Sequence, residues 1–202
     1  MMPPTLYENR LSGEGLDRLF RQARTFSAWL PDAVPTAILK EIFEIARLGP
    51  TSANSSPARF VFLTTAEAKS RLLPALSPGN VEKTQTAPVN VIVAWDNEFY
   101  DKLPELFPHA DMRKVFAGNQ ALIHETAFRN SSLEGAYFVL AARALGLDCG
   151  PMSGFNKDKV NAEFFPNGKW QVNFLCNLGY GERSKLYPRN PRLDFDEACL
   201  VL

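Results

Sequence analysis

Residues 49–57 read Gly-Pro-Thr-Ser-Ala-Asn-Ser-Ser-Pro, a stretch dense in turn formers and in small hydroxyl or amide side chains. The backbone of such a stretch can approach a flat ligand closely and offer hydrogen bonds to the polar edge of that ligand. An ordinary surface loop is the alternative interpretation. The segment is therefore a candidate ligand-binding loop between a helix and a strand.

Two arginines far apart in the sequence form a second candidate site. Arg24, followed by Thr25, comes at the end of the first predicted helix, and Arg192 lies near the C-terminus. If the fold brings the two arginines together, they can bind a phosphate dianion through bidentate, charge-assisted hydrogen bonds. Taken singly, each is equally consistent with a solvated surface arginine.

A third feature is the Asn-x-x-Lys pair of Asn80 and Lys83, just before a predicted central strand. Taken alone, the pair is a polar loop between a helix and a strand. The same sequence also contains Arg24, Arg192, the loop at residues 49–57 and Gly154. Taken together, these residues weaken that interpretation and favour one shared ligand site.

The motifs of several enzyme classes are absent. The sequence contains no Gly-x-Gly-x-x-Gly after a strand, no P-loop, no His-Glu-x-x-His and no Gly-x-Ser-x-Gly,. His109 and His124 are too few for a three-histidine zinc site, so no metal is expected,. With so few catalytic side chains, the hard chemical step is expected to fall to a cofactor.

The composition is that of a globular protein. Of the 202 residues, 46% are hydrophobic and 22% are charged, which predicts one domain over residues 1–202 with a flexible N-terminal arm at 1–13,. Because 22 basic residues balance 22 acidic ones, the chain offers no electrostatic footprint for nucleic acid or an anionic membrane,. No signal peptide is recognised, and Cys149, Cys176 and Cys199 form no Cys-x-x-Cys, so we expect buried, reduced thiols in a cytoplasmic protein,.

The apolar periodicity predicts the elements that must position these residues. A first helix is predicted around residues 16–23, and a second is predicted to begin at Asp32–Pro35 and to end at Gly49-Pro50,. The apolar face of the second helix would comprise Ile38, Ile42, Ile45 and Ala46. Strands are predicted at residues 59–64, 89–95 and 172–178, the second of them central because it shows almost no polar alternation,.

Further helices are predicted between and after these strands. Thr64 and Glu67 are spaced as a capping box for a helix through residue 73, and helices follow at residues 125–145 and 157–164,. From Gly135 the long helix is apolar nearly all round, which predicts burial in the core or in a dimer interface,.

Three other segments are predicted to contain no long helix or strand. Residues 97–119 are predicted as helical excursions outside the core, residues 150–155 as a tight connection, and residues 193–202 as an apolar tail. The elements do not alternate as βαβ units do, which disfavours a doubly wound fold.

The ordered set of motifs resembles the FMN-dependent nitroreductase family. The motifs are Arg24-Thr25, Pro-Thr-Ser-Ala-Asn-x-x-Pro at 50–57, the Asn80/Lys83 pair, Ala-Ala-Arg-Ala-Leu-Gly-Leu-Asp at 141–148, Pro-Met-Ser-Gly-Phe at 151–155 and Arg192. The resemblance extends from about Leu16 to Leu193. It implies an α+β fold, a three-layer α/β/α sandwich with a mixed, largely antiparallel sheet. It also implies an interlocked homodimer with FMN bound at the subunit interface.

Carried over residue by residue, the resemblance implies how this chain would bind FMN. Arg24, Thr25 and Arg192 would hold the phosphate, with Ser27 standing where many members have Arg or Lys. The residues implied to contact the flavin from the partner subunit are Pro50, Thr51, Ser52 and Asn54. Ser56-Pro57-Ala58 replaces the commoner Gln-Pro-Trp after this loop.

The same resemblance implies which residues would contact the flavin ring. Asn80 and Lys83 would face its pyrimidine edge, where Lys83 would support the negative charge of the reduced flavin,. The backbone N–H groups near Ser153 and Gly154 would point at N5, with Ser153 replacing a frequent Glu.

Stretches outside the flavin motifs resemble the malonic semialdehyde reductase branch of this family, also described as 3-hydroxypropionate dehydrogenase, which acts in pyrimidine degradation. They include Glu-Phe-Tyr-Asp-Lys-Leu-Pro-Glu-Leu-Phe-Pro-His-Ala-Asp-Met-Arg at 98–113 and residues 179–199. The implied reaction is ping-pong: NADPH or NADH reduces FMN, and malonic semialdehyde then takes hydride from N5.

A substrate this small must rely on its carboxylate for binding, and Arg113 and Arg59 are the candidate partners,. A surface ion pair is the alternative for each arginine. The sequence shows no clear general acid, although water, Ser153 or Tyr100 would serve.

Three other functions remain open. They are a broad nitroaromatic or quinone reductase on the same fold, a flavin-binding module without turnover, and a flavin-free structural dimer, which a yellow purified protein would exclude. A yellow protein that NADPH bleaches and that an aldehyde or a nitro compound reoxidises would distinguish an enzyme from a binding module.

Overall fold

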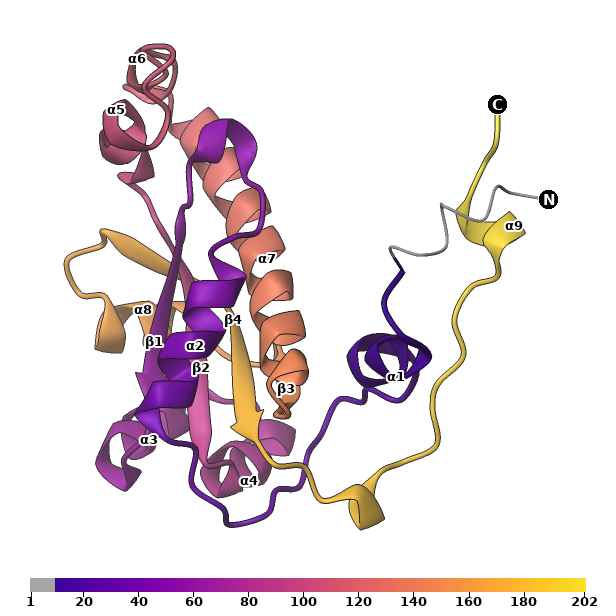
Figure 1. Ribbon diagram of the computed structural model, residues 1–202. Coiled ribbons are helices and arrows are strands. Elements are labelled where there is room, and N and C mark those ends of the chain that lie inside the picture. The colour runs from indigo at the N-terminus through magenta and orange to yellow at the C-terminus, as the bar shows by residue number, and fades with distance from the viewer. Residues whose placement is uncertain (1–9) are drawn as a thin grey trace.

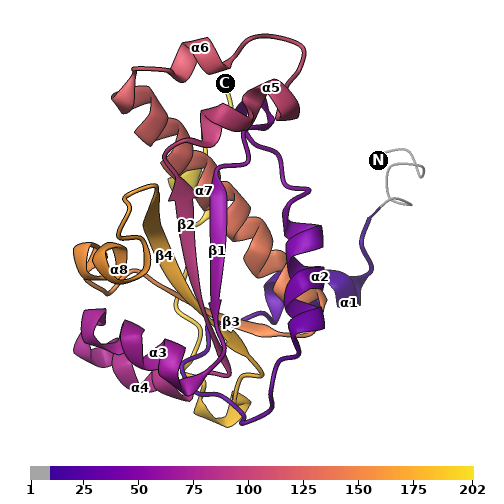
Figure 2. The ribbon, with the colours of Figure 1, turned by 90° about the vertical axis from the view of Figure 1, so that its left-hand side faces the viewer.

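The computed structural model describes residues 10–202, so the predicted N-terminal arm lies outside the described residues except for 10–13. Four strands form one sheet in the order β1-β2-β4-β3 (Figure 2). Their bounds are β1 Ala58–Leu63, β2 Val89–Asp96, β3 Asp148–Met152 and β4 Trp170–Gly179. All three strand pairings are antiparallel, and one isolated parallel bridge joins Thr25 to Cys149.

Helices cover the sheet, and the short helices α1 and α9 lie towards the two ends of the described chain (Figure 1). The α-helices are α1 Gly13–Leu16, α2 Thr36–Ala46, α3 Ala66–Leu72, α4 Pro78–Thr86, α5 Leu103–Leu106, α6 Arg113–Phe116, α7 Gln120–Ala144, α8 Lys157–Phe164 and α9 Phe195–Ala198. The short turns of other helical types are η2 Asp17–Arg21, η3 Ser52–Asn54, η4 Leu73–Ala75, η5 Phe99–Lys102 and η6 Arg183–Lys185.

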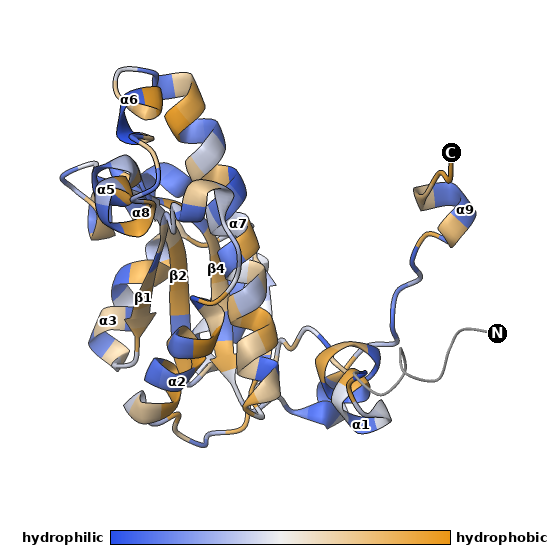
Figure 3. Cartoon of the chain, turned by 45° about the horizontal axis from the view of Figure 1, so that its top comes forward, coloured by the Kyte–Doolittle hydropathy of each residue, from blue (hydrophilic) through white to orange (hydrophobic). Residues whose placement is uncertain are grey.

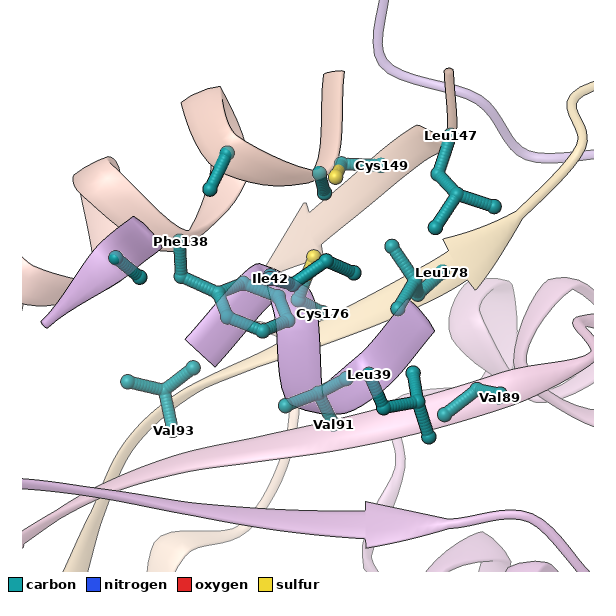
Figure 4. Packing of buried hydrophobic residues seen from close by; sticks show 13 residues of the cluster. Leu39, Ile42, Val89, Val91, Val93, Phe138, Leu147, Cys149, Cys176 and Leu178 are labelled. Carbon is teal, nitrogen blue, oxygen red and sulfur yellow. The ribbon is translucent and has the colours of Figure 1, made fainter. Parts of the chain in front are cut away.

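Strand β2 is buried along its whole length because both faces of the sheet are covered. Its side chains alternate between the faces, as the period of a strand requires. Val89, Val91 and Val93 pack against α2 and α7, and Ile92 and Ala94 pack on the opposite face with α3 and α8. Figure 4 shows the first of these layers, with Leu39, Ile42 and Phe138 over the valines of β2. The predicted three-layer fold with a largely antiparallel sheet is thereby confirmed.

Several local predictions were wrong. Residues 150–155 were predicted as a tight connection, but Asp148–Met152 form β3, an outer strand of the sheet where Pro151 is tolerated,. Residues 97–119 are not outside the core, since Phe99, Leu103 and Phe116 are buried with Trp95 in a separate cluster. The cap of α3 is Thr65, not Thr64, and its hydroxyl accepts from Ala68 N at 3.1 Å.

Two predictions of burial also need correction. Ile45 was predicted to face the core, but it is exposed on the outer side of α2. Leu39 of the same helix is buried in the core instead. Cys149 and Cys176 are buried free thiols as expected, but Cys199 is exposed. A hydrogen bond with the Cys176 thiol, together with burial, raises the pKa of Cys149 well above its ordinary value. The Cys149 thiol is therefore held in the protonated form.

The C-terminal segment leaves the body of the molecule. Figure 1 shows α9 and the chain end lying apart from the sheet and its helices, and Figure 3 shows hydrophobic residues in that segment. Leu193, Phe195, Leu200 and Val201 are all well exposed. Within residues 10–202, no helix combines the length and apolarity needed to cross a membrane.

Candidate functional site

A cationic cavity of about 820 Å³ lies between the end of η2 and the segment that follows η6. Its lining residues are Phe20, Ala23, Arg24, Thr25, Ser27, Arg143, Lys185, Leu186, Tyr187, Pro188, Arg189, Asn190 and Arg192. Five of them are Lys or Arg, and none is Asp or Glu. The structure therefore brings together Arg24, Thr25, Ser27 and Arg192, the residues predicted to hold a phosphate.

Two segments far apart in sequence form the walls of this cavity and are joined directly by arginines. The Arg24 guanidinium donates from Nη2 to Tyr187 O at 2.5 Å. In return, Arg189 Nη2 donates to Arg21 O and Ala23 O, both at 2.8 Å. Among residues 10–202, Arg192 donates only to the carbonyls of its neighbours Asn190 and Pro191, and it is exposed.

Phe26 anchors the segment that carries Arg24, Thr25 and Ser27. Its side chain is only 2% exposed, and its N–H donates to Cys149 O of β3 at 3.1 Å. A Cβ at Gly181 would lie 2.0 Å from the Phe26 ring, so only glycine fits there. With Phe26 buried, the neighbouring Thr25 and Ser27 are left on the exposed side.

Three of the cavity's cations were not predicted from the sequence: Arg143, Lys185 and Arg189. Arg143 belongs to α7, and its Nη1 donates to Leu19 O at 3.1 Å. A single charge within an otherwise apolar helix end was a usable signal, because an unpaired charge is costly to bury. Lys185 and Arg189 lie in an irregular polar segment, where no periodicity marks a function.

Asn80, Ser153 and Gly154 meet at a second place, beside the first turn of α4. Asn80 Nδ2 donates to Gly154 O at 2.7 Å, and Ser77 N donates to the same carbonyl at 3.0 Å. A Cβ at Gly154 would lie 2.6 Å from Asn80 Nδ2, so a larger residue there would displace the Asn80 amide. The N–H of Gly154 donates to no acceptor within residues 10–202.

Lys83 lies one turn further along α4. Its carbonyl accepts from Trp29 Nε1 at 3.0 Å, which ties α4 to the segment that carries Arg24. Its ammonium group makes no hydrogen bond or ion pair with any other described residue. The chain thus places a cation without a protein partner close to Asn80.

The loop Pro50–Asn54 lies elsewhere in the chain. Asn54 Nδ2 donates to Leu106 O of α5, and Ser52 N donates to Asn130 Oδ1 of α7, both at 2.8 Å. Asn130 and Arg143 are separated by about 20 Å along α7. The predicted loop contacts and the cationic cavity therefore lie far apart within one subunit.

Side-chain hydrogen bonds, one from within the loop and one from α7, hold the residues that follow the loop in place. Ala53, Asn54 and Ser56 have φ of 51°, 50° and 40°, a left-handed conformation that non-glycine residues adopt only under constraint,. Ser56 N donates to Thr51 Oγ1 at 3.1 Å, and Ala58 N donates to Glu134 Oε2 at 2.9 Å. Pro50, Ser52 and Asn54 are exposed, so the fixed loop is available to a second molecule.

Glu134 of α7 is a buried carboxyl group that was not identified from the sequence. The residue is 6% exposed. Burial raises the pKa of its carboxyl to about 7, against the lowering effects of the Ala58 N–H and the Arg59 charge. Glu134 also lines a cavity of about 260 Å³ with Arg47, Lys102 and Glu105.

The two arginines predicted to bind a substrate carboxylate both have carboxylate partners in the chain. Arg59 Nη2 contacts Asp96 Oδ2 at 2.8 Å, and its Nη1 donates to Ser56 O and Ala58 O. Arg113 Nη2 contacts Asp101 Oδ1 at 2.8 Å, and both side chains are about half exposed. Arg59 is thus fully engaged, whereas Arg113 remains accessible.

Comparison with known proteins gives the same fold. The model of the nitroreductase family matches residues 20–180. The chain belongs to the nitroreductase family. A relative from Ralstonia nicotianae, provisionally named NADH dehydrogenase/NAD(P)H nitroreductase, is 59% identical over 187 residues, covering 93% of this chain and 96% of the relative. A relative of the same provisional name from Rhodopseudomonas palustris is 58% identical, covering 93% and 95%.

Solved structures of this family superpose on the chain over almost its whole length. One from Exiguobacterium sibiricum, described as a provisionally assigned nitroreductase in complex with FMN, gives a TM-score of 0.85 at 19% identity, covering 96% of this chain and 99% of that one. A Bacillus subtilis structure gives 0.83 at 20% identity, covering 95% and 100%. These structures establish the nitroreductase fold. The family match at 20–180 includes Arg24 and Lys83, whereas Arg192 lies beyond it.

Proposed function

We propose that this chain is an FMN-dependent NAD(P)H oxidoreductase. The observation that carries the proposal is the cationic cavity, which gathers five Lys or Arg side chains and no carboxylate in a chain of the nitroreductase family. Such a cavity matches a phosphate group in charge and in hydrogen-bonding capacity. The FMN complex of the Exiguobacterium structure and the names of the relatives support the same cofactor and electron donor.

The residues present fit the cofactor. Arg24, Thr25, Ser27 and Arg192 would hold the phosphate, Asn80 and Lys83 the pyrimidine edge, and Ser153–Gly154 the N5 edge. The unpartnered Lys83 ammonium and the free N–H of Gly154 support this assignment, because each lacks the partner that a ligand would supply,. FMN would supply the hydride chemistry, accepting from NADPH or NADH and passing to a second substrate. The role of Lys83 is to place a positive charge where negative charge develops.

We propose that the active form is a homodimer. The loop Pro50–Asn54 lies about 20 Å along α7 from its own cationic cavity, so a complete site needs the loop of a second copy. Exposed apolar side chains support a large contact: Phe128, Leu133 and Tyr137 on α7, and Leu200 on the C-terminal segment. Such a patch on a free subunit is typical of a protein–protein interface.

For the second substrate we propose a short ω-oxo acid, malonic semialdehyde, reduced to 3-hydroxypropionate. The support is the resemblance of residues 98–113 to the malonic semialdehyde reductase branch, in a region that varies with substrate across the family. Arg113 lies in this region and stays accessible, so it is the preferred partner for the carboxylate, in exchange with Asp101. A nitroaromatic acceptor is the second candidate, favoured by the names of the relatives.

Steady-state kinetics test the substrate. Malonic semialdehyde should be preferred over a neutral aldehyde of equal length, and Arg113→Ala should reduce this preference by about 10- to 100-fold in kcat/KM, because a charge-assisted contact is lost. Lys114→Ala, which removes an exposed neighbour paired with Asp111, is the matched control and should leave the preference intact. A wild type without preference for the acid would refute the substrate. A preference that survives Arg113→Ala would refute only the role of Arg113.

Equilibrium binding tests the phosphate site. Arg192→Ala should weaken FMN binding by about 10- to 150-fold, because a bidentate arginine–phosphate contact contributes about 1.5–3 kcal/mol. Arg192 makes no contact that the fold needs, so the apo-protein should unfold at the same temperature as the wild type. Arg71→Ala, which breaks an exposed pair with Glu163 elsewhere, is the control. An unchanged flavin affinity in fluorescence titration would identify Arg192 as a solvated residue.

A further inference from the structure

The C-terminal end of α4 is closed by the sheet beneath it. The last four carbonyls of a helix have no partner within the helix, and in α4 these include the carbonyls of Lys83 and Thr84,. Lys83 O accepts from Trp29 Nε1 and from Asn177 Nδ2, both at 3.0 Å. Thr84 O accepts from Asn90 Nδ2 at 2.9 Å. Buried side chains from β2 and β4 thus take the place that water takes at an exposed helix end.

Asn90 and Asn177 are directly opposite each other in the ladder of β2 and β4, and each is 1% exposed. Asn90 Nδ2 donates to Asn177 Oδ1 at 2.9 Å, and Asn177 Nδ2 also reaches Thr84 Oγ1 at 3.3 Å. Asn90 Oδ1 is buried without a partner. An unsatisfied buried amide oxygen is costly. The pair is therefore best explained by the two carbonyls of α4 that its amide groups hold, those of Lys83 and Thr84.

The geometry points to a role for this amide pair in the chemistry of the flavin: Asn177, with Asn90, is a positioning residue that fixes the backbone of Lys83 and so sets where its ammonium lies. This inference rests on the proposed function, in which Lys83 faces the pyrimidine edge of FMN. Trp29 and Asn177 fix the Lys83 carbonyl from two different elements, while the side chain itself has no protein partner. A fixed backbone fixes the point from which the Lys83 side chain extends, so fewer groups have to reorganise when negative charge develops on the flavin.

The expected consequence is a change in the preference of the site for reduced over oxidised FMN. In Asn177→Ala the Lys83 carbonyl loses one donor, α4 loosens at its end, and the ammonium is less well placed. We expect this preference to fall about tenfold, which corresponds to a decrease of about 30 mV in the two-electron midpoint potential. Lys83→Met should lower the potential by at least as much.

Asn173→Ala provides the matched control. Asn173 lies on the same strand as Asn177 and is also buried, at 7% exposure. Its amide also holds a helix, since Nδ2 donates to Ser131 Oγ at 2.8 Å and to Ser132 Oγ at 2.9 Å, both on α7. It makes no hydrogen bond to α4. A purely structural effect of removing a buried amide should therefore appear equally in both variants.

The experiment measures the midpoint potential of bound FMN in wild type, Asn177→Ala, Asn173→Ala, Lys83→Met and the double variant Asn177→Ala/Lys83→Met. Hydrogen exchange of the amides of α4 is measured in parallel on the flavin-free proteins. We expect faster exchange in α4 and a lower potential for Asn177→Ala, with neither change for Asn173→Ala. In the double variant the potential should equal that of Lys83→Met, because Asn177 acts through Lys83.

Three results would overturn the inference. If Lys83→Met lowers the potential but Asn177→Ala does not, the positioning role is wrong and the role of Lys83 stands. If the two changes add in the double variant, Asn177 acts on the flavin by another route. If Lys83→Met leaves the potential unchanged, both the inference and the proposed role of Lys83 fail.

Discussion

Replacing Glu134 by glutamine should raise the free energy of unfolding by about 3 kcal/mol at pH 8 and leave it almost unchanged at pH 4. The glutamine amide oxygen can still accept the hydrogen bond from Ala58 N that Glu134 Oε2 accepts in the wild type. The substitution therefore removes the buried charge and keeps the contact. The difference in free energy of unfolding between the two proteins should therefore come only from ionisation of Glu134, and it should vary with pH.

The direction follows from the raised pKa of this carboxyl. Its ordinary value is 4.5, and burial raises the pKa in the folded chain to about 7. Between these values the unfolded chain has released the proton while the folded chain still holds it, so stability falls as pH rises. The loss is about 1.4 kcal/mol per pH unit and is complete above pH 7. Below pH 4.5 Glu134 is protonated in both the folded and the unfolded chain, and none of this stability has been lost.

Urea denaturation between pH 4 and 8 measures this dependence, with protein and FMN concentrations held constant because binding and association add to apparent stability. Glu125→Gln is the matched control. Glu125 is exposed on the same helix and pairs with Arg129, so its replacement should change stability by only a few tenths of a kcal/mol at any pH,. A Glu134→Gln protein with the same pH dependence as the wild type would show that folding does not raise the pKa of Glu134.

Two variants that each lose FMN should restore one normal site when combined in a heterodimer. Arg24→Ala removes a cation from the cavity. Asn54→Val places a β-branched residue at φ 50° and removes the bond to Leu106 O, which should displace the loop,. Each homodimer should bind FMN at least tenfold more weakly than wild type. In the heterodimer, the intact loop of one subunit faces the intact cavity of the other, so half the sites should have wild-type affinity.

Co-expression with two different affinity tags isolates the heterodimer, and fluorescence titration counts its tight sites. Asn54→Gly is the control, because glycine tolerates the left-handed backbone and should keep the loop in place. A heterodimer without any tight site would mean that loop and cavity act within one subunit, or not at all. Sedimentation of the FMN-bound wild type as a 22.5 kDa monomer at micromolar concentration would contradict the dimer itself.

The sequence predicted most of the long elements because their patterns are local. The run of residues 89–95, apolar except for Asn90, became most of β2, and the residues predicted as the long helix fall almost entirely within α7, Gln120–Ala144. Strand β3 was missed because Gly150-Pro151 has the composition of a turn, and only its pairing with β4 makes it a strand. Phe99 and Phe116 were misplaced because short helices give too few residues for a periodicity.

The candidate site shows a similar limit. Arg24 and Arg192 were predicted to share a site, and the structure places them in one cavity. Lys185 and Arg189 were missed because their contribution depends on how distant segments fold together. Glu134 and Asn177 were missed for a related reason: each acts on the backbone of another segment, a role that depends on contacts and leaves no mark in local composition.

The most direct test of the proposed function is an anaerobic titration of the purified protein. The protein should be yellow, with FMN as the flavin that heat releases. It should lose its flavin absorbance at about one NADPH or NADH per FMN, and regain it when malonic semialdehyde or a nitroaromatic compound is added. A colourless protein that does not take up FMN would contradict the account. A yellow protein that neither nucleotide reduces would show a flavin-binding module without turnover.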